Sequence, residues 1–323
     1  MKKSFKLLLA AAVLVTEVFA VALPILTTSA KADGAIQAIT HAGFGGGTDV
    51  TTRMMLLRTR RYLKQDMQLV NKKGGGGAAS MDYMMTLPAD GQHTLTWTTG
   101  HAVSMALGKT KVKLSDMQPL ARGTDDPQLF VVNCKNDIKD AKKFVSAQKS
   151  KSLKYGTTHV GGIDDVSAIA FTKKGNLTDP TIVAYKGVAP IKTNLIKGDI
   201  DVGVLNLGEA VTEIEDGTLC VAVVLASKRM EKLSNVPTAT ELGIPVVLST
   251  VRGFVTRKGV PADRKKQLED AMIKAMEHKY FQSFLTDIGL DSTSVVGADE
   301  WGKQMEVMLA EMTAQLKALG YIK

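Results

Sequence analysis

Several classes of protein are excluded by what the sequence has little of. Its 323 residues include only two cysteines and 5% aromatic residues, and no block of lysine and arginine exceeds two or three residues. So few cysteines exclude a disulfide-stapled scaffold. The formal charge of +9 fits an acidic small ligand or an anionic surface, but nothing concentrates it into a basic and aromatic face for nucleic acid.

The common catalytic and cofactor motifs are also missing or broken. No G-x-S-x-G segment occurs, and the five histidines are dispersed without zinc-ligand spacing. The turn at 43–48 has Thr48 where a dinucleotide fingerprint has its third glycine, and Gly108-Lys109-Thr110 has Val103 where a phosphate loop begins with glycine. We therefore expect no enzyme, no cofactor and no bound metal.

The first 32 residues have the pattern of an export signal. A basic start precedes an apolar run at 7–16, and the A-x-A pattern of a cleavage site lies at 30–32. The alternative is a membrane anchor, but Glu17 and Pro24 interrupt the apolar stretch that a spanning helix needs. We predict a signal peptide at 1–32, cleaved near Ala32, and a periplasmic location for the mature protein.

Strand-like and helix-like segments alternate through most of the chain. This rhythm is typical of parallel sheets with helices on both faces, so the expected fold class is α/β. Strands are predicted at 36–39, 67–70, 94–97, 128–132, 153–155, 181–185, 200–205 and 219–226, and helices at 48–64, around 81–85 and 138–145, and at 166–171, 190–197, 209–215, 261–278 and 299–319.

The spacing of apolar residues supports two of these helices. In the helix at 48–64, Val50, Met54, Leu57 and Arg61 lie on one face. In the last helix, a stripe that contains several methionines is expected to be core rather than an adaptable binding surface.

The two cysteines lie in apolar, strand-like runs. Cys134 and Cys220 can pair in an oxidising compartment, or both can be buried free thiols. The sequence leaves both possibilities open.

Two glycine-containing turns link a strand to a helix. In the first, at 41–49, the glycines allow close approach to the backbone, and Thr48 is expected to cap the helix. In the second, at 156–165, Thr157 and Thr158 offer hydroxyls, while Asp164 and Asp165 are expected to favour the helix N-terminus. Free N–H groups at such helix starts suit an anion, although a tight turn without a ligand explains each pattern equally well.

Two further polar turns, at 98–101 and at Asn206, also follow strands. In open α/β sheets, ligands bind outside the carboxyl ends of the strands. The four turns together therefore predict one ligand crevice.

Several segments resemble the solute-binding proteins of tripartite tricarboxylate transporters, the Bug or TctC-type family. The resemblance covers nearly all of 36–320 and rests on the order and spacing of several motifs. These are the glycine turn at 43–49, the N-K-K-G-G-G-G run at 71–77, P-A-D-G at 88–91, Y-K-G at 185–187, G-D-I-D at 198–201, N-V-P-T at 235–238 with E-L-G at 241–243, and R-G-F at 252–254. The second turn departs from the family's commoner form, with G-G-I-D-D at 161–165.

The resemblance implies a type II, Venus-flytrap periplasmic binding protein with two domains, each a mainly parallel sheet flanked by helices. Domain 1 would comprise 33–125 and 252–323, and domain 2 would comprise 126–251. The protein would be a monomer that captures a small organic carboxylate, most often a di- or tricarboxylate, for the membrane subunits of a tripartite transporter. A ligand-presenting partner of a membrane sensor is the alternative, and an exported enzyme is a weaker one.

One carboxylate of the ligand would be held by the N–H groups of the first turn, with help from a hydroxyl at 98 or 99. Lys186 and Arg252 are weaker candidates, each read first as a member of a surface or inter-strand ion pair. The residues predicted to bind the ligand are Phe44, Gly46, Gly47, Thr48, Asp49, Thr98, Thr99, Thr157, Thr158, Gly162, Ile163, Asp165 and Asn206.

Overall fold

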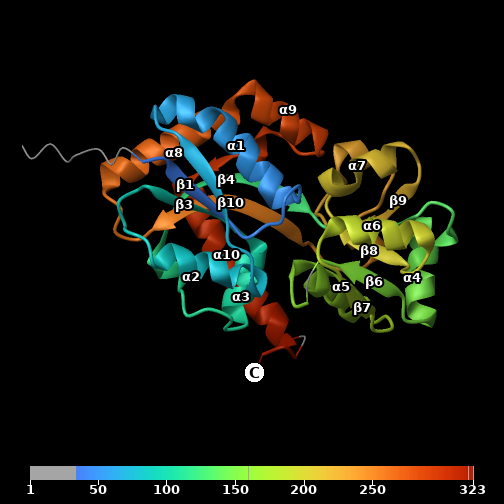
Figure 1. Ribbon diagram of the computed structural model, residues 1–323. Coiled ribbons are helices and arrows are strands. Elements are labelled where there is room, and N and C mark those ends of the chain that lie inside the picture. The colour runs from blue at the N-terminus through green and yellow to red at the C-terminus, as the bar shows by residue number, and fades with distance from the viewer. Residues whose placement is uncertain (1–33, 159, 319, 323) are drawn as a thin grey trace, which may run out of the picture. The chain divides into compact units, whose positions relative to one another are not determined.

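The computed structural model describes residues 34–158, 160–318 and 320–322. The predicted signal peptide therefore lies outside the described residues. Among the described residues, no helix combines the length and the apolar character that crossing a membrane requires. Two β-sheets organise these residues (Figure 1).

The first sheet has six strands in the order β11-β4-β10-β3-β1-β2. β1 is parallel to β2 and to β3, whereas β10 is antiparallel to β3 and to β4, and β11 is antiparallel to β4. Their bounds are β1 (Ile36–Thr40), β2 (Met67–Asn71), β3 (His93–Thr98), β4 (Met117–Pro127), β10 (Ser249–Arg257) and β11 (Val296–Gly297).

Helices cover both faces of this sheet (Figure 1). On one face, an apolar cluster includes Met55 of α1 (Gly47–Leu63), Met272 of α8 (Ala262–Glu277) and Phe281 of α9 (Lys279–Asp287). On the other face lie α2 (Ala78–Met85), α3 (Thr99–Ala106) and α10 (Ala298–Ala318). In α8, α9 and α10 the buried residues follow the apolar periodicity, since a helix is stabilised chiefly by the face that it buries.

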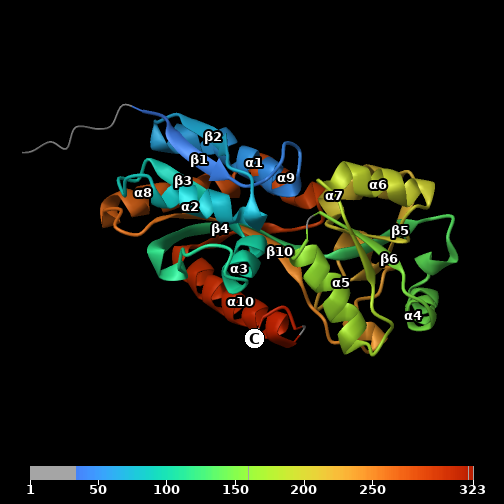
Figure 2. The ribbon, with the colours of Figure 1, turned by 60° about the horizontal axis from the view of Figure 1, so that its bottom comes forward.

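The second sheet has five strands in the order β7-β6-β8-β5-β9. β6 is parallel to β7 and to β8, whereas β5 is antiparallel to β8 and to β9. The bounds are β5 (Leu129–Asn133), β6 (Lys154–Thr157), β7 (Thr181–Ala184), β8 (Val202–Leu205) and β9 (Leu219–Val224). The accompanying helices are α4 (Ala141–Ser150), α5 (Ile163–Lys174), α6 (Val188–Lys197) and α7 (Leu207–Glu215), as Figure 2 shows from a second side.

Two faces of the second sheet are filled by different side chains. Phe130 packs against Phe144 of α4 and Phe171 of α5, with ring centroids 5.8 and 4.9 Å apart. The opposite face buries Leu195 of α6 and Ala210 of α7 in a separate cluster. This alternation follows from the period of two along a strand, which sends neighbouring side chains to opposite faces.

The α/β class with two helix-flanked sheets is confirmed, but the sheets are mixed rather than mainly parallel. The difference arises at β4 and β10, which form a long antiparallel pair in the middle of the first sheet. The sequence of β4 contains Pro119, Pro127 and two aspartates, so it does not have the pattern of a buried strand. The helices α3 and α9 also went unpredicted.

The face of α1 that carries Val50, Met54, Leu57 and Arg61 is not its buried face. Leu57 is 52% exposed, and the buried residues of this helix are mostly threonines. Thr52 illustrates the reason, because its hydroxyl lies 2.7 Å from that of Thr96 on β3 and also donates to the Thr48 carbonyl. A threonine hydroxyl that is satisfied in this way packs as a small apolar group, so apolar spacing alone misplaces the face.

The prediction for the last helix is confirmed. Its stripe is buried, with Trp301 ring-to-ring against Trp97 of β3 at 5.8 Å. The buried members are Trp301, Met305, Met308, Met312 and Leu316. These methionines therefore belong to the core.

The chain connects the two sheets twice, at Gln128 between β4 and β5 and over 225–248 between β9 and β10, and these connections are tied to each other. The Gln128 N–H donates to the Leu248 carbonyl at 2.9 Å, Leu225 N–H to Gln128 at 2.8 Å, and Leu248 N–H to Leu225 at 2.9 Å. The first sheet draws its strands from 36–127 and 249–297, and the second from 129–224. The domain boundaries at 125/126 and 251/252 stay a prediction, since sheet membership alone does not define a domain.

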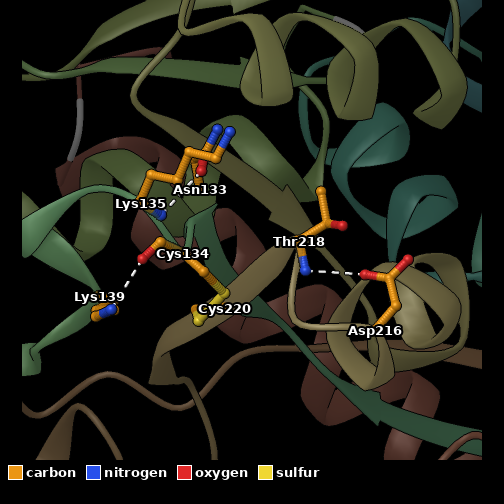
Figure 3. The surroundings of a disulfide bond; sticks show 7 residues. All are labelled: Asn133, Cys134, Lys135, Lys139, Asp216, Thr218 and Cys220. Atoms are coloured by element: carbon orange, nitrogen blue, oxygen red, sulfur yellow. Dashed lines mark hydrogen bonds between the residues drawn. A yellow bond between two sulfur atoms is a disulfide. The ribbon is translucent and has the colours of Figure 1, made fainter.

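A disulfide joins Cys134 to Cys220, 86 residues apart (Figure 3). Cys220 lies on β9 opposite Val132 of β5, and Cys134 follows the end of β5, where its N–H donates to the Thr218 carbonyl. The bond therefore fastens an edge strand of the second sheet to its neighbour. Of the two possibilities that the sequence left open, the structure has the paired form.

Replacing both cysteines, as Cys134→Ser with Cys220→Ser, should lower the free energy of unfolding by up to roughly 4–5 kcal/mol, because the bond closes a long loop in the unfolded chain. Urea unfolding checks this value. The wild-type protein in excess reductant is the control and should match the variant. Equal midpoints for oxidised wild type and variant would show that the bond contributes no stability.

Candidate functional site

The best candidate for a functional site surrounds Arg252, a buried residue of β10 that is 2% exposed. Its Nη1 pairs with Asp126 Oδ2 of β4 at 3.0 Å, and its Nε donates to Thr48 Oγ1 of α1 at 3.2 Å. Its Nη2 donates to Asn206 Oδ1 at 3.1 Å. One guanidinium therefore holds together the first turn, the antiparallel pair β4–β10 and the turn after β8.

The expectation that Arg252 belongs to an inter-strand ion pair is confirmed, whereas a surface position is wrong. Asp126 lies on the neighbouring strand β4, and both partners are buried. Lys186 differs, because it is exposed just beyond β7.

Asn206 follows β8 and begins α7. Its amide nitrogen donates to the carbonyls of Asp126 and Pro127, both at 3.0 Å, and its oxygen accepts from Arg252. The side chain is thus fully engaged within the protein. Direct donation to a ligand carboxylate, as the sequence analysis expected, requires one of these bonds to break.

Glu209 was not among the residues predicted from the sequence. Its Oε2 accepts from the Asn206 N–H at 3.0 Å, which completes a capping box at the start of α7. Its Oε1 lies next to Gly47, where an added Cβ would be 3.4 Å from it and 2.5 Å from Arg252 Nη2. The spacing of Asn206 and Glu209 could have revealed the cap, but not the contact with α1.

Burial dominates the electrostatics of both acids near Arg252. It raises the pKa of Asp126 to about 7, although the charge and hydrogen bonding of Arg252 act in the opposite direction. It also raises the pKa of Glu209, against the opposing effects of Arg252 and of backbone hydrogen bonding from Asn206 and Gly47. The single charge of Arg252 therefore offsets only part of the cost of burying these two carboxylates.

The first turn is organised by Asp49. Its carboxylate accepts from the Gly45 N–H at 3.1 Å and pairs with Arg53 at 2.9 Å. Burial raises the pKa of Asp49, but the Arg53 guanidinium and the Gly45 N–H outweigh it and leave the pKa below its usual value. Asp49 is a first-turn helix residue, and its acid already uses one of the N–H groups of the turn.

Of the remaining residues of the first turn, Gly46 caps the helix and Phe44 is exposed to solvent. Gly46 caps α1, so the expectation that Thr48 is the N-cap is wrong, and the Gly46 N–H donates to the Gly43 carbonyl at 3.2 Å. Phe44 is 76% exposed, with the Arg53 guanidinium 5.6 Å and Lys73 Nζ 5.7 Å from its ring centroid. Phe44 therefore lies on the outer side of this turn, between two cations.

The second turn leads into α5, with Gly162 as N-cap and Ile163 as the first helical residue. Asp164 accepts from the backbone N–H of Thr158 at 2.9 Å and from its hydroxyl at 2.6 Å. Asp165 accepts from the Gly161 N–H at 2.6 Å. The expectation that both aspartates serve the helix start is confirmed.

Thr157 differs from its neighbours. Its side chain is fully buried at the end of β6, and within the part of the chain that the structure describes its hydroxyl has no hydrogen-bond partner. A buried polar atom without a partner is unusual and costs free energy. It is the one predicted contact of the second turn with an uncommitted hydroxyl.

The two threonines after β3 are engaged elsewhere. The Thr99 hydroxyl donates to the Ser249 carbonyl at 3.0 Å and accepts from the Val251 N–H at 2.9 Å. Thr98 caps α3, and its N–H donates to His101 Nδ1 at 3.0 Å. Thr99 therefore fixes the start of β10, three residues before Arg252.

Among the predicted site residues, the structure brings Gly47, Thr48 and Asn206 together around Arg252. Two cavities lie elsewhere: one of about 630 Å³ is lined by residues such as Glu269 and Lys274, and one of about 740 Å³ by residues such as Arg122 and Lys228. None of the predicted ligand-binding residues lines either of them.

A family model described as the tripartite tricarboxylate transporter family receptor, TctC, matches residues 51–319. The chain belongs to this TctC family of solute-binding receptors. Accordingly, it is a receptor and not an enzyme. The resemblance inferred from its motifs is confirmed.

Known proteins agree with the TctC assignment. Protein BugT of Bordetella pertussis is 25% identical over 218 residues, which are 65% of this chain and 66% of BugT. MatC of Rhodopseudomonas palustris, solved with bound malate, matches with a TM-score of 0.78, at 22% identity over 87% of this chain and 98% of that one. An R. palustris protein solved with adipate matches with a TM-score of 0.80, at 21% identity over 88% and 97% of the chains.

The TctC receptor should not tolerate a side chain at position 47. In Gly47→Ala, the new Cβ would lie within 2.5 Å of Arg252 Nη2. Overpacking of this kind costs typically about 1–3 kcal/mol. Urea unfolding measures the loss.

The matched control is Gly46→Ala, whose Cβ would meet only the Gly43 carbonyl at 3.5 Å. Equal stability of the two variants would contradict the close approach of Arg252 to Gly47. A Gly47→Val variant that loses ligand binding would consequently report on Arg252 as well as on the ligand.

The contribution of Asp126 to stability should fall as the pH rises from about 4 to about 7. The pKa of Asp126 is about 7 in the folded protein and near 4 in the unfolded chain, so its folded form binds more protons in this range. Glu209 acts in the same direction, whereas His101, whose pKa burial lowers, acts in the opposite one. Urea unfolding at pH 5 and pH 7.5 tests this, because the stability of Asp126→Asn relative to the wild type should rise between these two pH values. A relative stability that is the same at both would rule out this role of Asp126.

Proposed function

We propose that this protein is a periplasmic receptor that captures a small organic carboxylate and delivers it to the membrane subunits of a tripartite tricarboxylate-type transporter. The observation that carries the proposal is the convergence of the first turn and the turn after β8 on the buried guanidinium of Arg252. These turns belong to the two different sheets. A ligand bound beside them would be held from both.

The chemistry of the turns supports a carboxylate. The start of α1 presents backbone N–H groups and the positive end of a helix dipole, which favour an anion. A planar guanidinium matches a carboxylate in geometry and charge. Relatives with this fold that were solved with malate and with adipate support the same class of ligand.

The proposed site also includes the second turn, through Thr157. A ligand oxygen that reached its unpartnered hydroxyl would gain a hydrogen bond without breaking one in the protein. The proposal keeps the other predicted residues of the second turn, Thr158, Gly162, Ile163 and Asp165, as its neighbours. Of these, the N–H and the hydroxyl of Thr158 are already used by Asp164.

A hinge at the two connections between the sheets would let the sheets close on the ligand. Gln128, Leu225 and Leu248 form a narrow ring of backbone hydrogen bonds. Closure around a ligand at such a hinge is a common response in periplasmic binding proteins.

The function is tested by thermal unfolding of residues 33–323 with a panel of organic acids that includes malate and adipate. An acid at 100 times its dissociation constant should add about 2.7 kcal/mol of stability. Native mass spectrometry of the purified protein should show the acid bound and chemically unchanged. No stabilisation by any acid, or conversion of the acid, would refute the proposal.

The second turn is tested by Thr157→Val, which removes the buried hydroxyl and keeps the side-chain shape. We expect about tenfold weaker binding of the stabilising acid, the loss of roughly one hydrogen bond. The unfolding midpoint without ligand should not fall, because among the described residues this hydroxyl has no hydrogen-bond partner to lose. Calorimetry measures the affinity. Thr193→Val, at an exposed site on α6, is the control. Equal affinities for both variants would remove Thr157 from the site.

A further inference from the structure

The start of α1 already has a carboxylate next to it, and this carboxylate belongs to the protein. Glu209 Oε1 lies 3.4 Å from the point where a Cβ added to Gly47, the first residue of α1, would be. Burial raises the pKa of Glu209, and hydrogen bonding from the Gly47 backbone acts in the opposite direction. Glu209 comes from α7, beside the second sheet. An acid from one side of the proposed site thus meets the anion-binding end of a helix on the other.

Arg252 is the cation that interacts with Glu209, and it also interacts with Asp126. The charge of Arg252 favours the ionised forms of Glu209 and Asp126. The negative charge of Asp164 opposes ionisation of Glu209, and that of Asp125 opposes ionisation of Asp126. Asp126 Oδ1 is buried, and among the described residues it has no hydrogen-bond partner. A ligand carboxylate that arrived here would be the third anion around a single guanidinium.

We propose that Glu209 is a specificity-determining residue that competes with the ligand: its carboxylate takes the place beside Gly47 and Arg252 that a ligand carboxylate needs. This inference rests on the proposed function. Glu209 is held by the Asn206 N–H at 3.0 Å, so it can leave Gly47 while its other oxygen stays attached to the cap of α7. Binding of an organic acid therefore includes the displacement of one carboxylate by another.

The first test is the affinity of Glu209→Gln for malate and adipate. Glutamine keeps the shape of the side chain and an oxygen for the cap, but it removes the competing charge. The variant should bind the dicarboxylate that stabilises the wild type about tenfold more tightly. Glu213→Gln is the matched control, since Glu213 lies on the same helix and pairs instead with Lys192 at 2.7 Å; its affinity should equal that of the wild type.

The second test needs no knowledge of the natural ligand. Acetate serves as a simple carboxylate probe, and the amide resonance of Gly47 reports its arrival by NMR. In Glu209→Gln, the Gly47 amide should respond to about tenfold less acetate than in the wild type. Without acetate, the same amide should shift with pH in the wild type, as Glu209 titrates, and shift much less in the variant.

The outcomes separate the two proposals. If the wild type binds a dicarboxylate and Glu209→Gln binds it equally or more weakly, competition by Glu209 is refuted and the receptor function stands. If no acid of the panel stabilises either protein, but the Gly47 amide of the variant responds to less acetate than that of the wild type, the function is refuted and the competition stands. An identical acetate response of both proteins refutes the competition in either case.

Discussion

The burial of one guanidinium constrains most of what surrounds it. Arg252 is taken out of water between β4, α1 and the turn after β8, and each of its nitrogens must find an acceptor there. Asp126, Thr48 and Asn206 provide these acceptors from elements that are far apart in the sequence. The same burial explains the glycine at position 47, because a Cβ there would lie only 2.5 Å from Nη2 of Arg252.

The ion pair of Arg252 with Asp126 holds these elements in position more than it stabilises the fold. Burial raises the pKa of Asp126 to about 7, so the cost of desolvating this carboxylate exceeds what its attraction to Arg252 returns. A further charge nearby would change the ionisation of such a pair. An anion that arrived at the proposed site would therefore alter the electrostatics of the contact between elements of both sheets.

The elements that could be predicted from the sequence are those whose pattern lies in neighbouring residues. The methionine stripe at 305–312 and the two glycine turns could be read because apolar spacing and glycine placement reflect neighbouring residues. β4 was not predicted because its prolines and aspartates obscure a strand that pairs with the distant β10 and β11. The packed face of α1 was not predicted because threonines form most of it. The role of Glu209 depends on Gly47, more than 160 residues away, and no local pattern encodes such a contact.

At each of the three helix starts around the proposed site, an acidic side chain of the protein accepts a hydrogen bond from a backbone N–H. Asp49 accepts from Gly45, Asp164 from Thr158, and Glu209 from Asn206. In each case an acid of the protein already uses N–H groups that an empty anion cradle would offer. For the proposed carboxylate ligand, affinity would then depend on the difference between its carboxylate and those of the protein in similar surroundings. A modest difference favours release as well as capture, which a receptor that hands its ligand to a transporter requires.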